Sequence, residues 1–69
     1  MERSLPARNA LLERKAKADT IRYELQVLDQ HINRLANDLE LGRVLSYGEH
    51  ILPIVKQLMS FTRTVAEAV

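Results

Sequence analysis

The sequence predicts an all-α protein, an antiparallel helical hairpin whose long first helix carries a heptad repeat. Its 69 residues are 46% apolar and include only two glycines and two prolines, a composition that favours helix. Apolar residues recur at alternating spacings of three and four, which is typical of a helix lying lengthwise on another helix. Gly42 and a helix-start pattern from Ser46 place a turn between two helices. We expect one domain over residues 1–69, completed by oligomerisation because so short a chain buries little surface by itself.

The first helix is predicted over about residues 10–41. Residues 1–8 contain Pro6 and no periodicity, so we expect a loose lead-in. Asn9 fits an N-cap, and neither proline nor glycine interrupts the stretch from Ala10 to Leu41. The a and d positions of the heptads form a seam along this helix, made of Ala18, Ile21, Leu25, Leu28, Ile32, Leu35 and Leu39.

A turn is predicted over residues 42–47, followed by a second helix over about residues 48–68. Gly42 stands just past the periodic stretch, where a helix commonly stops. Ser46 and Glu49 fit a capping box. Pro53 leaves two alternatives open. It either bends the second helix, or a short turn covers residues 46–51 and the main helix begins with Pro53 in its first turn.

The second helix is expected to leave part of the first uncovered. The short connection makes the helices antiparallel neighbours. At about 1.5 Å per residue the second helix reaches back only to about residue 22, so Leu11, Leu12 and Ala18 have no partner within the chain.

The second helix is also apolar on more than one side, although a surface helix usually has a single stripe somewhat wider than about 100°. A one-sided core with some exposed apolar residues is one explanation. We favour burial against a partner, because the uncovered start of the first helix indicates the same. The first stripe is Ile51, Val55, Leu58 and Val65, widened by Ile54, Phe61 and Ala68; the second stripe is Leu52, Met59 and Ala66.

We therefore predict a partner protein, either a second copy or another helix. In an antiparallel pair of first helices Lys17 approaches Asp38, Arg22 approaches Asp29 and Glu24 approaches His31, whereas a parallel pair brings like charges together. The alternative is that these charges are simply solvated. The predicted contact residues are Leu11, Leu12, Ala18, Ile21, Leu25, Leu28, Ile32, Leu35, Leu39, Leu52, Val55, Met59 and Ala66.

Few residues offer catalytic or metal chemistry. The sequence has no cysteine and two remote histidines, His31 and His50, which we expect at the surface and not in a zinc site. Two glycines cannot form a phosphate loop, and Asp38 and Glu40 point in different directions from a helix. We predict a protein that is not an enzyme and has no cofactor or metal.

The predicted function is a helix-mediated interaction module that serves as a small subunit, adaptor or chaperone of a larger complex. The alternative is a nucleic-acid-binding regulator, a hairpin dimer that uses basic residues near the start of the first helix. Acidic residues interrupt this basic cluster, and the net charge is only +1, so nucleic acid is the weaker alternative. Without a long apolar run or a signal peptide, we expect a soluble, cytoplasmic protein that does not enter the membrane. The basic residues are Arg8, Arg14, Lys15, Lys17 and Arg22.

Overall fold

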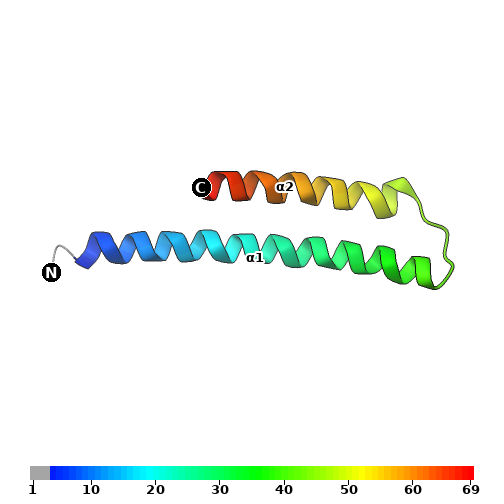
Figure 1. The fold of residues 1–69 in the computed structure, drawn as a ribbon, viewed down its shortest axis with the longest axis horizontal. Helices are drawn as coiled ribbons and strands as arrows, with labels where there is room; N and C mark the ends of the chain where they lie inside the picture. Colours follow the sequence, from blue (N-terminus) through cyan, green and yellow to red (C-terminus); the bar gives the residue numbers. More distant parts are fainter. Residues whose placement is uncertain (1–3) are drawn as a thin grey trace.

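The computed structural model describes residues 4–69, with side chains from Asn9 onward. Helix α1 (Ser4–Glu40) and helix α2 (Leu52–Ala68) lie antiparallel, and a π-helical turn (Tyr47–Ile51) precedes α2 (Figure 1). The described residues contain no β-strand. The prediction of an all-α antiparallel hairpin is confirmed.

Helix α1 begins earlier than the sequence indicated. It starts at Ser4, so Asn9 lies inside the helix and is not its N-cap. The predicted lead-in is therefore wrong for residues 4–8, while residues 1–3 lie outside the described residues. Pro6 is compatible with this start, because in the first turn of a helix a missing N–H group loses no intrahelical hydrogen bond.

Gly42 ends α1 as predicted. Its φ of +71° lies in the left-handed region that favours glycine. The Gly42 N–H donates to the carbonyl of Leu39 at 3.1 Å, and the Arg43 N–H donates to the carbonyl of Asp38 at 2.9 Å. These two bonds form a Schellman motif, which satisfies the last carbonyl groups of the helix.

Ser46 caps the π-turn, but Glu49 does not return the bond expected of a capping box. The Ser46 hydroxyl accepts from the Glu49 N–H at 3.1 Å, whereas the Ser46 N–H donates to Nδ1 of His50 at 3.1 Å. Pro53 stands in the first turn of α2, so the second of the two alternatives holds. The chain makes a separate turn, and no interior proline bends α2.

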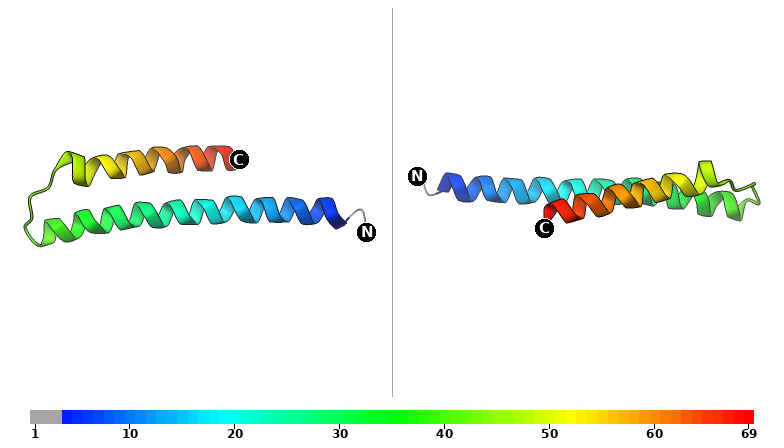
Figure 2. Two further views of the ribbon diagram at one scale, coloured as in Figure 1. Left: turned by 180° about the vertical axis from the view of Figure 1, so that it is seen from behind. Right: turned by 90° about the horizontal axis from the view of Figure 1, so that it is seen from above.

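The hairpin is long and thin. It measures 62 × 18 × 12 Å, and its radius of gyration is 17.6 Å, against about 11 Å for a compact domain of this length. Its thickness is close to that of a single helix, about 10–12 Å. The views in Figure 2 show the two helices side by side in one layer, crossing at a shallow angle. Among the described residues, no further element lies over the two broad faces of this layer.

Helix α2 ends beside Lys17 and Thr20 of α1, nearer the start of α1 than the predicted residue 22. The chain folds back so that His50 lies against Asp38, two residues before the end of α1. Residues 4–16 of α1 extend beyond α2 (Figure 1). We call this segment the overhang.

The contact between the helices contains little apolar core. Among the described residues, Leu28 is the one buried apolar side chain. The half-buried residues identify the contacting sides. Within the first apolar stripe predicted for the second helix, Ile51, Val55 and Leu58 are exposed, whereas Val65 and the widening residues are half-buried. The contacting residues are Ile21, Glu24, Leu28, His31 and Leu35 on α1, and Ile54, Gln57, Phe61, Thr64, Val65 and Ala68 on α2.

No helix within the described residues is both long enough and apolar enough to cross a bilayer.

Candidate interaction surface

One face of the hairpin layer is polar. Oε1 of Glu24 accepts from the Thr64 hydroxyl at 2.6 Å and from the Ser60 hydroxyl at 3.3 Å. The Gln57 side chain donates to the Glu24 carbonyl at 3.3 Å. These bonds join the polar flanks of the two helices, so the flanks lie on the same side of the layer. Hydrogen bonds within the chain therefore cover part of this polar face.

The opposite face of the layer is apolar. On α1, the contact residue Leu28 has Glu24 on one flank and the row of Leu25 and Ile32 on the other. On α2, Gln57 lies on one flank of the contact side and Leu58 on the other. Because the polar flanks share one face, the apolar flanks must share the other. We call this surface the open face: Leu25, Ile32 and Leu39 of α1, with Ile51 of the π-turn and Val55 and Leu58 of α2.

Side chains of the open face are strongly exposed for apolar residues. Leu25 is 52% exposed, Ile32 44% and Leu39 64%, and Leu58 on α2 is 45% exposed. Met59 and Ala66, both exposed, lie on the outer side of α2, roughly opposite its contact with α1. Single exposed leucines are common, but rows at helical spacing on two neighbouring helices are typical of a contact surface.

The open face continues past both ends of α2. Leu11, 61% exposed, lies two heptads before Leu25 on the same side of the overhang. At the other end of the hairpin, Leu39 belongs to the open face; Leu41 and Val44 are also exposed, but Leu41 lies about 200° around the helix from Leu39. Leu12 is also exposed but lies about 100° further around the helix, away from the open face.

The structure divides the predicted seam into two rows. The d row packs within the chain: Leu28 is buried, and Ile21 and Leu35 are half-buried. The exposed residues of the a row, Leu25, Ile32 and Leu39, instead lie on the open face. Of the predicted partner contacts, Ala18 and Leu52 are half-buried, and those exposed are Leu11, Leu12, Leu25, Ile32, Leu39, Val55, Met59 and Ala66.

The chain exposes more surface than a compact protein of its mass. A compact protein of 7.9 kDa exposes about 4,400 Å². This chain exposes 5853 Å², an excess of roughly 1,400 Å². A typical stable interface removes about 800 Å² from each partner. The excess is therefore large enough for such an interface.

A buried polar network joins the end of α1 to the π-turn. His50 is 4% exposed, so the expectation of a surface histidine is wrong for this residue. Its Nδ1 accepts from the Ser46 N–H, which leaves the ring proton on Nε2 to be donated to Oδ2 of Asp38 at 2.7 Å. Arg43 donates to Oδ1 of Asp38 at 3.2 Å. The hydrogen bond from His50, assisted by Arg43, holds the pKa of Asp38 below its ordinary value of 3.8.

Every polar atom of the Asp38–His50 pair named above has a structural partner. The Ser46 hydroxyl accepts from the Glu49 N–H, so it is not aligned with the imidazole as a nucleophile would be. Among the described residues, no group of three or more His, Asp or Glu side chains could hold a metal ion. The network supports the hairpin turn.

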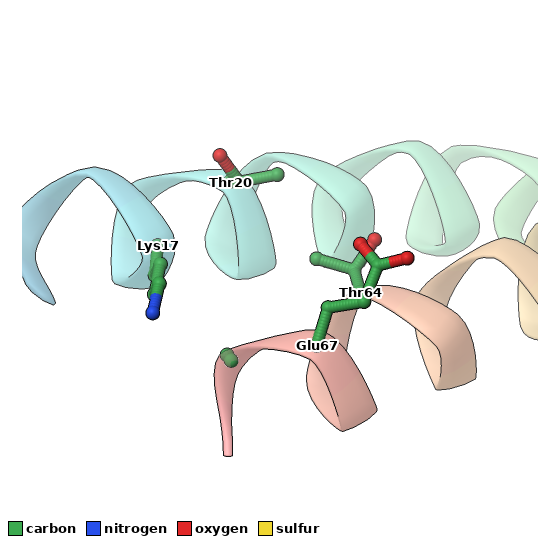
Figure 3. Close-up of a pocket in the computed structure, with 5 residues that line it drawn as sticks. Lys17, Thr20, Thr64 and Glu67 are labelled. Carbon is green, nitrogen blue, oxygen red and sulfur yellow. The ribbon is translucent and has the colours of Figure 1, made fainter. Parts of the chain in front are cut away.

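A small hollow lies between the helices at the free end of α2. Its volume is about 220 Å³, and Lys17, Thr20, Thr64, Glu67 and Ala68 line it (Figure 3). Ligand pockets usually measure about 300–1,000 Å³ and enclose most of their ligand. The hollow contains one cation, one carboxylate and two hydroxyl groups, with no histidine or cysteine to act on a substrate.

The predicted charge contacts of a partner helix are partly used within the chain. Asp38 and Oε1 of Glu24 have hydrogen-bond partners within the hairpin, while Oε2 of Glu24 is buried and has none in the part of the chain that the structure describes. Arg22 forms an exposed salt bridge with Asp19 at 3.0 Å, and Asp29 accepts from Asn33 at 3.2 Å. Exposed pairs such as these are weak and exchange partners readily.

No protein-family model, curated protein or solved structure matches this chain. The functional argument therefore depends on the surface alone.

Proposed function

We propose that the protein is a helix-mediated interaction module, without enzymatic activity, that binds a helical partner through the open face as a small subunit, adaptor or chaperone. The observation that carries this proposal is the row of Leu25, Ile32 and Leu39 lying uncovered beside a second exposed apolar row on α2. Two neighbouring rows of apolar side chains form the kind of surface on which another amphipathic helix packs.

The limited core of the hairpin supports the same proposal. Domains generally consist of at least two layers of secondary structure around a shared core, whereas this hairpin is a single layer whose described residues include one buried apolar side chain. A partner on the open face supplies the missing layer. It buries residues that the fold leaves in water, which is the main source of binding free energy.

The test compares two lysine substitutions on α1. Ile32→Lys places a charge in the middle of the open face, whereas Gln30→Lys adds the same charge at an exposed position on the far side of the helix. Both variants are expressed in the cells that normally make the protein and crosslinked there. Complexes of the wild-type chain should persist with Gln30→Lys and disappear with Ile32→Lys.

Two results would count against the proposal. If both variants gave the same amount of crosslinked complex, the open face would not be the contact surface. Loss of crosslinked nucleic acid on substitution of Arg14, Lys15 and Lys17, with protein complexes unaffected by Ile32→Lys, would favour the nucleic-acid alternative.

A further inference from the structure

We infer that the partner on the open face is a second copy of this chain, turned end for end, so that two hairpins form an antiparallel four-helix bundle. This inference rests on the proposed function and names its partner. Three features of the chain support it: the spacing of the exposed residues, the distribution of charge and the position of the overhang.

The exposed residues of α1 are spaced symmetrically about Leu25. When a second α1 runs in the opposite direction with the two Leu25 side chains at the centre, Leu11 meets Leu39 of the other copy and Ala18 meets Ile32. These contacts alternate larger and smaller side chains along one line, as interdigitating layers require. The same two-fold axis brings α2 against α2 of the other copy, where Val55 and Leu58 lie.

Charge on α1 favours the same orientation. The sequence up to Arg22 carries six basic and three acidic residues, whereas Tyr23 to Glu49 carries five acidic and two basic residues. The end-for-end arrangement places each basic segment beside the acidic segment of the other copy. At the flank of the a row, Arg22 faces Asp29 of the other chain, and the two-fold axis makes this contact twice.

The overhang discriminates between the two possible orientations. If both hairpins pointed the same way, each overhang would remain uncovered beyond the partner's α2. In the reversed orientation, the overhang of each copy lies over the other copy's closed end, where Leu39 is exposed on the open face. Helix α1 then contacts its counterpart over residues 10–40, a length of about 46 Å. An interface of this length can remove the excess exposed surface from both copies.

The first experiment measures mass and uses the lysine variants. Native mass spectrometry and analytical ultracentrifugation of the purified chain at micromolar concentration should give twice its 7.9 kDa mass. Ile32→Lys should raise the dimer dissociation constant ~30-fold or more, because it places two charges in the buried centre of the interface. Gln30→Lys should leave the constant unchanged. Circular dichroism of each variant confirms that the helices are intact.

The second experiment tests the orientation with single thiols, which is direct because the chain has no cysteine. Leu25→Cys should form an interchain disulfide under mild oxidation, since the two residues meet at the two-fold axis. Leu39→Cys alone should not, because its counterpart lies about 42 Å away along the helix. A mixture of Leu11→Cys and Leu39→Cys chains should yield mixed disulfides, and Gln30→Cys should yield none.

Each contrary result identifies what fails. If the purified chain has the mass of a single chain at high micromolar concentration, the partner is not a second copy. The proposed function still stands if Ile32→Lys abolishes the crosslinked complexes in cells. If Leu39→Cys forms an interchain disulfide with itself as readily as Leu25→Cys does, the end-for-end orientation is wrong. A dimer unaffected by Ile32→Lys overturns the open face as its surface.

Discussion

The two ends of α1 have different surroundings within the chain. At the closed end, Gly42 stops the helix, Asp38 bonds His50 and Arg43, and Ser46 caps the following turn. At the other end, the overhang projects past α2, and its leucines Leu11 and Leu12 are both exposed. Polar bonds within the chain stabilise one end, whereas none of the described residues covers the apolar side chains Leu11 and Leu12 at the other end. A small hairpin can thus have a well-defined turn and still be incomplete as a fold.

The largest expected effect compares a packed leucine with an overhang leucine. Leu28→Ala should lower the free energy of unfolding by ~2–5 kcal/mol, because it removes the one buried apolar side chain of the described residues. Leu12→Ala should change it by less than about 0.5 kcal/mol, the size of an ordinary surface effect. Urea denaturation followed by circular dichroism measures both. Similar losses for the two variants would contradict the distinction between the packed region and the overhang.

A smaller effect is expected from the two glycines at the closed end. Gly42→Ala should cost about 1 kcal/mol, because an L residue is strained in the left-handed region. A Cβ at Gly42 or Gly48 would meet no atom within 4 Å, so sterics do not distinguish the two sites. Gly48 has no positive φ, and Gly48→Ala should be neutral or stabilise by up to about 1 kcal/mol. In thermal denaturation, Gly42→Ala should melt at a lower temperature than Gly48→Ala. The reverse order would refute the role of Gly42.

The smallest effect is expected in acid and concerns Asp38. Because its pKa in the folded chain lies below the ordinary value of 3.8, the unfolded chain binds the proton first as the pH falls. The stabilisation is complete above that ordinary value and is lost as the pH falls through the lower, folded pKa. Between about pH 4.5 and about pH 2.5, the urea midpoint should fall more for the wild-type chain than for Asp38→Asn. Parallel curves would show that Asp38 contributes nothing to the acid sensitivity of the closed end.

The sequence predicted the hairpin well because its strongest signals are local. An uninterrupted period of three and four residues, a glycine stop and a serine cap each act over one or two helical turns, and the structure contains all three. The start of α1 was less certain, because Pro6 is tolerated in a first turn and so does not mark the boundary of the helix.

The packing within the hairpin was harder to predict. Apolar periodicity grouped Ile51, Val55 and Leu58 into the first stripe of the second helix, but these residues are exposed, and Gln57 and Thr64 face α1 in the structure. They do so because Glu24 offers hydrogen bonds from the opposite helix, and a pattern that counts apolar residues does not register such pairs. The same applies to His50, whose ring replaces Glu49 in the cap through contacts that spacing alone does not reveal.

The thinness of the layer has a calorimetric consequence. The heat capacity change of unfolding follows the apolar surface that is newly exposed, about 12–15 cal/mol/K per residue in ordinary domains. A single layer whose leucines are already exposed to water has a much smaller heat capacity change when it unfolds. If a partner chain covers the open face, most of the heat capacity change comes from separating the two chains. The melting temperature then rises with protein concentration, as mass action requires.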